Sequence, residues 1–189
     1  MLITLENKNI NKKLMIALSV IFLILLIWVI VFKCNYNEGL HIEASKAMTI
    51  AERLAYKMVP FEKFIEAVEA GGILAIVEII ALFFNVICFL PFGAFGRFFT
   101  NKGWLIILIG GIFSLSIEIF QLFSCWGGPD YIDLISNTLG VALGVWIYKL
   151  IRHRLADELI NKLALWSVVT TAPAAAFAVI NSIINFPGF

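Results

Sequence analysis

Acidic side chains occur inside long apolar runs of this 189-residue chain, where a charge needs a physical reason. Glu78, Glu118 and Asp133 lie in three successive runs. A charged side chain in hydrocarbon costs at least about 2.5–3.5 kcal/mol on insertion scales, so such residues usually mark function. Two neighbouring buried carboxyl groups can share one proton. Glu118 and Asp133 are therefore the first candidates for a functional pair.

The same three runs carry further polar residues at helical spacing. In the third run, Ser114, Glu118 and Gln121 are four and three residues apart. At the start of the fourth run, Asp130, Asp133 and Asn137 are three and four residues apart. Such spacing places each set on one face of a helix. Polar faces avoid lipid, so they most simply turn toward one another. The predicted polar site consists of Glu78, Asn85, Glu118, Gln121, Asp130, Asp133 and Asn137.

These polar residues also have structural interpretations. Polar side chains at helix interfaces in membranes often do no more than hold the helices together, at about 0.6–2 kcal/mol each. Asp130 stands where the fourth run begins, and there its carboxylate could cap a helix by accepting bonds from free N–H groups. Two buried carboxylates exceed what packing requires, which favours a functional role for Glu118 with Asp133.

The composition excludes a single soluble domain. Hydrophobic residues make up 61% of the chain and charged residues 14%, against about 45–50% and about 25% in soluble domains. The net charge of +1 excludes a strongly basic nucleic-acid-binding protein. A membrane-spanning helix needs about 20 apolar residues. The sequence predicts an all-α bundle of about five transmembrane helices in one domain, residues 1–189, with spans at 14–32, 72–95, 104–123, 131–151 and 163–184.

Local signals define these spans. The first follows Lys12 and Lys13 and is too long for a cleaved signal peptide, which indicates an uncleaved signal anchor. We expect Pro91 to break the second span near its end and Pro173 to kink the fifth. The link at 124–130, rich in Gly and Pro, predicts a tight antiparallel hairpin.

Basic residues indicate the orientation. With five spans they collect on one side, which should be cytoplasmic; they are Lys8, Lys12, Lys13, Arg97, Lys102, Lys149, Arg152, Arg154 and Lys162. The opposite side has a hairpin without Lys or Arg, and a loop at 33–71 with five basic residues and six glutamates. This predicts a cytoplasmic N-terminus and an extracytoplasmic C-terminus.

The loop at 33–71 has a pattern of its own. Apolar residues recur at helical spacing between Ala47 and Met58, with charged residues on the other faces. The pattern predicts an amphipathic helix in this first extracytoplasmic loop. It fits a helix in the membrane interface and, equally, a helix packed on the mouth of the bundle.

Nothing in the sequence indicates a cofactor or a dedicated metal site. The histidines, His41 and His153, fall on opposite sides of the membrane, and oxygen ligands alone suit loosely held Mg²⁺ or Ca²⁺. Cys34 and Cys125 both fall outside, so they could form a disulfide or remain thiols.

Four ordered motifs of the chain resemble those of the VanZ-like family of small bacterial membrane proteins. They are VPF at 59–61, NVICFLPFG at 85–93, SIEIFQ at 116–121 and DYIDLISNTLG at 130–140, the last followed by Gly144. The resemblance covers about residues 14–154. The chain differs from the family in having Gly127 near an expected arginine and Ile132 at the place of a frequent third acid.

The resemblance implies an accessory role in cell-envelope biology or in the response to the glycopeptide teicoplanin, at the outer face of the bacterial cytoplasmic membrane. Membrane lipids, a lipid-linked envelope precursor or a glycopeptide are the implied partners. A hydrolase or transferase is one alternative, since paired acids can act as acid and base, but no nucleophile motif stands out. A small proton-coupled transporter is the other, although the chain has no internal repeat.

Overall fold

The computed structural model describes residues 12–31, 47–52, 65, 69, 71–124, 130–152 and 157–185. Within these ranges the chain forms five long α-helices and no β-strand. The helices are α1 (Lys12–Val31), α5 (Gly72–Phe99), α6 (Gly103–Ser124), α7 (Tyr131–Arg152) and α8 (Asp157–Asn185). The prediction of an all-α protein is confirmed.

Long apolar stretches make this a multi-pass membrane protein. Among the described residues, four stretches are long and apolar enough to cross a membrane: Lys13–Ile30, Ile79–Phe99, Gly103–Ser124 and Tyr131–Arg152. Large apolar side chains such as Leu108, Phe123 and Trp146 are exposed on these helices, as lipid contact requires. The fifth expected span, 163–184, lies within α8. Its crossing and the single-domain assignment stay predictions.

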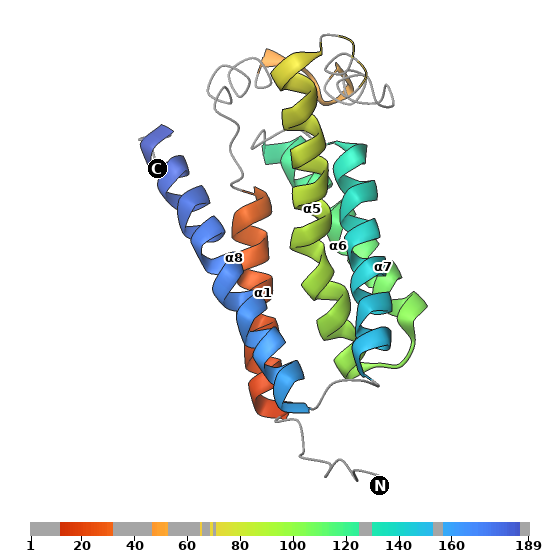
Figure 1. Cartoon of the computed structure of the whole chain (residues 1–189). Helices are drawn as coiled ribbons and strands as arrows, with labels where there is room; N and C mark the ends of the chain where they lie inside the picture. Colours follow the sequence, from red (N-terminus) through yellow and green to blue (C-terminus); the bar gives the residue numbers. More distant parts are fainter. Residues whose placement is uncertain are drawn as a thin grey trace, which may run out of the picture.

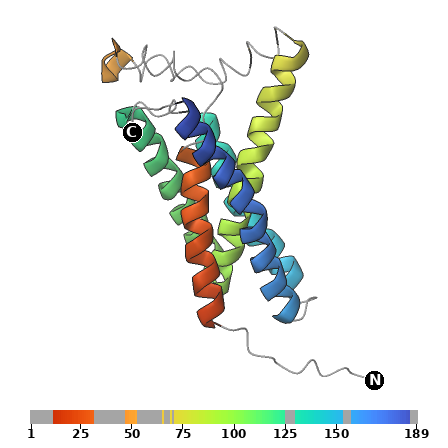
Figure 2. The same ribbon diagram turned by 90° about the vertical axis from the view of Figure 1, so that its left-hand side faces the viewer.

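The helices form two groups that pack on each other. In the first group α7 contacts both α5 and α6, and in the second α1 pairs with α8 (Figures 1 and 2). Helices α1, α6 and α8 run in one direction and α5 and α7 in the other (Figure 1). The start of α1 and the end of α8 therefore lie at opposite ends of the bundle.

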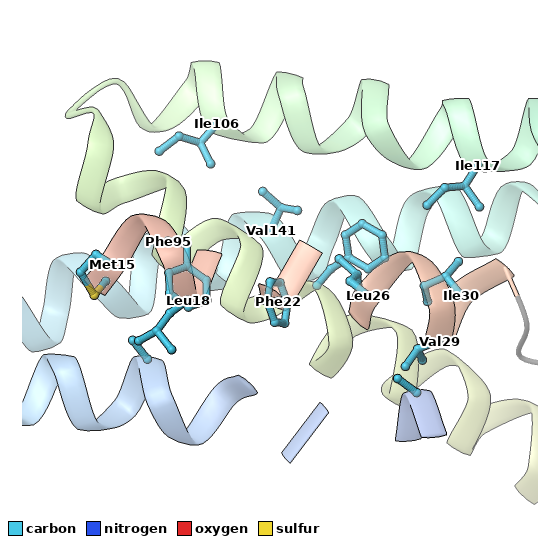
Figure 3. Packing of buried hydrophobic residues seen from close by; sticks show 13 residues of the cluster. Met15, Leu18, Phe22, Leu26, Val29, Ile30, Phe95, Ile106, Ile117 and Val141 are labelled. Atoms are coloured by element: carbon cyan, nitrogen blue, oxygen red, sulfur yellow. The ribbon is translucent and has the colours of Figure 1, made fainter. Parts of the chain in front are cut away.

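One stripe of α1 supplies much of the apolar core (Figure 3). Its buried residues recur every three or four positions, which is the period of one helix face; they are Met15, Leu18, Phe22, Leu26, Val29 and Ile30. The Phe22 ring lies 5.5 Å from that of Phe95 on α5, centroid to centroid. The α8 residues Ala164 and Ala175 belong to the same core. The stripe thus joins the two groups of helices.

Helix α5 continues through Pro91, so the expected break there is wrong. The helix runs without interruption from Gly72 to Phe99, four residues beyond the predicted end of the span. A proline inside a helix removes one N–H donor and crowds the carbonyl four residues before it, and neighbouring helices can accommodate both changes. Proline therefore does not end this helix. Pro173 likewise lies inside α8.

Glycines let α5 and α7 pack backbone against backbone. A β-carbon added at Gly140 or Gly144 would clash with the carbonyl oxygen of Val86 or Leu90 on α5. One added at Gly93 would meet the carbonyl oxygen of Val141 and lie 2.8 Å from the Val145 nitrogen. Small residues allow such close approach between membrane helices. The Gly140-x-x-x-Gly144 pair thus permits the close approach that its spacing predicts.

The structure also describes the start of a short helix in the first loop. Residues 50–52 are helical, and Thr49 donates from its backbone nitrogen and its hydroxyl to Glu52 Oε2, both at 2.7 Å. The Glu52 nitrogen donates back to Thr49 Oγ1 at 3.3 Å, which completes a capping box. The Thr49 hydroxyl and then its N–H lower the pKa of Glu52. Most of the predicted amphipathic segment lies outside the described residues.

We predict that Gly144→Ala destabilises the protein by about 1–3 kcal/mol, the usual effect of overpacking. The added methyl group meets the α5 backbone, which cannot move aside as a side chain can. Gly111→Ala is the matched control, because its nearest neighbour would be the Thr138 hydroxyl oxygen at an ordinary 3.5 Å. Thermal unfolding in detergent measures both. Equal melting temperatures for the two variants would contradict the packing described above.

We predict that Thr49→Ala raises the pKa of Glu52 toward its usual value, because it removes the hydroxyl donor. Since the folded pKa is depressed, the cap stabilises the helix start above the usual pKa of Glu52. That stabilisation is lost as the pH falls through the lowered pKa. Carbon-13 NMR of labelled glutamates in micelles measures the titration, with Glu52→Gln assigning the signal. Thr49→Ser should keep the depressed pKa.

Candidate functional site

Asp130 caps the N-terminus of α7. Its Oδ1 accepts a hydrogen bond from the backbone nitrogen of Ile132 at 2.8 Å, and its carbonyl accepts one from Leu134 at 3.2 Å. An N-cap residue makes this pattern, with its side chain satisfying an N–H group of the first turn. The capping interpretation of Asp130 is therefore confirmed.

Glu118 reaches the same helix end from α6. Its Oε2 accepts a hydrogen bond of 2.7 Å from the backbone nitrogen of Asp130. The Glu118 side chain is only 7% exposed. A carboxylate at a helix N-terminus is stabilised by the aligned peptide dipoles of that helix. The buried carboxyl group of Glu118 thus lies where the backbone of α7 favours its ionised form.

Asp133 connects α7 to α5. It occupies the third position of α7 after the cap, and its Oδ1 accepts a 2.5 Å hydrogen bond from Asn85 Nδ2. In a capping box, the side chain at this third position bonds to the N–H of the cap residue. Here Glu118 of α6 makes that bond, and Asp133 bonds to Asn85 instead. Three helices therefore meet at the N-terminus of α7.

A buried hydrogen bond sets the register of α6 against α7. Asn137 Nδ2 donates to Ser114 Oγ at 2.9 Å, and both side chains are buried. Because the helices are antiparallel, four residues forward from Ser114 and four residues back from Asn137 reach the same height. This register places Glu118 at the level of Asp133.

Two oxygen atoms next to these carboxylates have no hydrogen-bond donor among the residues that the structure describes. They are Gln121 Oε1 and Asn137 Oδ1. Gln121 is 4% exposed and follows Glu118 by one turn, and Asn137 is 1% exposed and follows Asp133 by one turn. Buried polar atoms normally have a partner, so each such atom calls for an explanation.

Glu78 is the predicted site residue whose side chain the structure does not describe. It lies on α5 two turns before Asn85. Its membership of the site stays a prediction. We name the group formed by Asn85, Ser114, Glu118, Gln121, Asp130, Asp133 and Asn137 the polar cluster.

An aromatic layer borders the polar cluster on the side away from the α6–α7 link. Phe113 of α6 stacks on Phe92 of α5 with ring centroids 5.5 Å apart. Phe89, which is fully buried, lies 6.2 Å from Phe113 by the same measure. Phe89 follows Asn85 by one turn, and Phe113 directly precedes Ser114. The layer therefore separates the polar cluster from the other half of the bundle.

Oxygen acceptors dominate the chemistry of the polar cluster. Its donors from Asn85, Asn137 and the Asp130 backbone already bond within the cluster. Across the described residues, no group of three or more His, Cys, Asp or Glu side chains could hold a metal ion. The arrangement is suited to a ligand that brings hydrogen-bond donors.

Ser114 is not among the site residues that the sequence predicts. Its position four residues before Glu118 was the available signal, but a small side chain in a membrane helix reads equally well as packing. The structure instead makes it the acceptor for Asn137. Ser116, on the exposed side of α6, bonds to its own helix at Ile112. The predicted alternatives for Cys34 and Cys125 fall outside the described residues.

Comparison with known proteins identifies relatives of the chain. A family model described as VanZ/LLP1 matches residues 19–152. The chain is also similar to Protein VanZ of Enterococcus faecium, at 26% identity over 155 residues, which cover 79% of this chain and 83% of the relative. No solved structure matches the chain. The matched region contains the whole polar cluster and ends at the last residue of α7.

The capping role of Asp130 predicts how its variants behave. Asp130→Ala should destabilise the protein by about 0.5–2 kcal/mol, because it leaves an N–H group of α7 without its acceptor. Asp130→Asn should keep most of the stability, since asparagine caps helices as well as aspartate does. Thermal unfolding in detergent measures both variants. A destabilisation as large for asparagine as for alanine would show that the charge of Asp130, and not its capping bond, is what the fold needs.

Proposed function

The chain belongs to the VanZ/LLP1 family, and from this premise we propose that it is an accessory protein of the bacterial cell envelope. Its role would lie in envelope biology or in the response to glycopeptides such as teicoplanin. The polar cluster of α5, α6 and α7 would carry this role. The observation behind the proposal is the buried Glu118 carboxylate, held 2.7 Å from the backbone nitrogen of Asp130 at a junction of three membrane helices.

The direction in which the polar cluster faces follows from the charges at the two ends of the bundle. Basic residues stand at the start of α1, in the α5–α6 link, at the end of α7 and early in α8, all at one end. Lysine and arginine are enriched on the cytoplasmic side of membrane proteins. We therefore place this end in the cytoplasm of a bacterial plasma membrane, with the C-terminus outside.

In this orientation the polar cluster belongs to the outer half of the membrane. Asp130 lies at the start of α7, and Glu118 lies six residues, about 9 Å, from the end of α6. The layer of Phe89, Phe92 and Phe113 lies below the cluster, on the cytoplasmic side. A ligand would approach from outside, as a lipid headgroup, a lipid-linked envelope precursor or a glycopeptide could.

The carboxylates would act by binding rather than by catalysis. Glu118 already accepts a backbone N–H group, and Asp133 accepts the amide of Asn85. These bonds hold each carboxylate in a fixed position. A polar group bound beside them would be oriented at the outer surface of the membrane, where envelope precursors and glycopeptides meet.

A complementation experiment tests the proposal. In a deletion strain, we predict that Glu118→Gln and Asp133→Asn fail to restore wild-type teicoplanin susceptibility, while their protein levels match the wild type. Each change replaces an ionisable carboxyl group by a neutral amide and keeps the size of the side chain. Ser116→Ala is the matched control, because Ser116 lies on the exposed side of the same helix. Wild-type behaviour of both acid variants would reject the proposed role, and accumulation of a lipid-linked precursor in the deletion strain would favour an enzyme instead.

A further inference from the structure

We propose that the polar cluster binds a protonated primary amine, on a lipid headgroup or on a soluble molecule. The inference rests on the proposed function and names the chemical class of its ligand. It follows from two buried amide oxygen atoms of the cluster that have no donor among the described residues, and from the carboxyl groups one turn away from them.

The first observation is a local lack of donors. Gln121 Oε1 and Asn137 Oδ1 have no donor among the described residues, although both side chains are more than nine-tenths buried. The amide nitrogen of Asn137 is already bonded to Ser114. By the register above, Gln121 lies at the level of Asp130 and Asn137 at the level of Ser114, so the two oxygen atoms lie at the outer and inner ends of the cluster. A buried acceptor without a donor is unfavourable, so a ligand that supplies a donor to Gln121 gains the free energy of satisfying it.

The second observation concerns the sign of the charge. Glu118 lies one turn before Gln121 on α6, and Asp133 lies one turn before Asn137 on α7. Nearby carboxyl groups favour a positively charged donor over a neutral one. A primary ammonium group carries this charge and offers three donors with no acceptor, which matches a cluster rich in oxygen atoms.

A calcium ion fits the polar cluster less well than an ammonium group. Calcium takes six to eight oxygen ligands at about 2.3–2.6 Å. Within the described ranges, no three His, Cys, Asp or Glu side chains are grouped so that they could hold a metal ion. An ammonium group needs only three acceptors, and amide oxygens serve it as well as carboxylates do.

The position of the cluster suits an amine at the membrane surface. Helix α7 begins directly after Asp130, so the cluster occupies the first two turns of this helix. The fully buried Phe89 and the stacked pair of Phe92 and Phe113 lie beneath it. A lipid whose acyl chains remain in the bilayer could place its headgroup amine at this depth, and a small amine could reach it from the aqueous side.

Lipid retention by the purified full-length protein tests the proposal. Detergent-solubilised protein is mixed with equal amounts of phosphatidylethanolamine and phosphatidylcholine with identical acyl chains, and bound lipid is measured by native mass spectrometry. Phosphatidylcholine has a charged headgroup without N–H donors. We expect about tenfold preference for phosphatidylethanolamine, the factor for one hydrogen bond to a charged donor. Butylamine in solution should compete if the site accepts the amine alone; without competition, a phosphatidylethanolamine preference assigns the site to the lipid.

Variants of Gln121 connect the preference to the polar cluster. Gln121→Met removes the unpartnered oxygen at similar size and should abolish the preference. Gln121→Glu keeps an acceptor and should retain the preference, and Ser116→Ala on the exposed side of α6 should leave it unchanged. If Gln121→Met does not fold, the wild type and Gln121→Glu still test the proposal. Equal retention of the two lipids by the wild type, without butylamine binding, would overturn it.

The lipid-retention experiment and the complementation experiment can fail independently of each other. If Glu118→Gln and Asp133→Asn lose complementation but the wild-type protein shows no amine preference, the polar cluster functions with a different ligand. If the amine preference is present and both acid variants complement fully, the amine site exists but does not serve the proposed envelope role. Preferential retention of Ca²⁺ that displaces butylamine would overturn the choice of ligand.

Discussion

The backbone-to-backbone packing of α7 on α5 is the constraint on which the rest of the structure depends. At Gly93, Gly140 and Gly144 a single added methyl group would enter the main chain of the facing helix. Such an interface allows only one register, because a shift along either helix brings a larger side chain against the backbone. That register places Asn85 of α5 beside Asp133 of α7. On its other face, α7 meets α6 through Gly110, which packs closely on Val141.

Hydrogen bonds at the N-terminus of α7 involve residues of three helices, α5, α6 and α7. Asp130 bonds to its own first turn, Glu118 of α6 bonds to the Asp130 nitrogen, and Asp133 bonds to Asn85 of α5. In the low dielectric of a membrane interior such bonds polarise one another, so a change at one residue affects the others. Packing and function are therefore difficult to separate by large substitutions, whereas changes of charge at constant size can separate them.

Much of the fold could be predicted from the sequence, because apolar runs of about 20 residues and the backbone demands of a bilayer leave few choices. The polar faces of α6 and α7 could also be predicted, since spacing alone fixes which residues share a face. The partner of Glu118 could not. It is a backbone N–H group, and its position depends on the register of α6 against α7, which the buried bond between Asn137 and Ser114 sets. The continuity of α5 through Pro91 was missed because a proline predicts a break unless the surrounding packing is known.

The family match and the helix packing divide the bundle in a similar way. The family match ends with α7, and α8 packs chiefly on α1 rather than on the three helices of the polar cluster. Among the described residues, α8 supplies Ile160, Ala164 and Ala175 to the buried core, and the small alanines let it lie close to α1. The hydrogen bonds described above within the polar cluster join α5, α6 and α7. Helix α8 therefore packs on α1, outside the matched region, whereas the polar cluster lies wholly inside it.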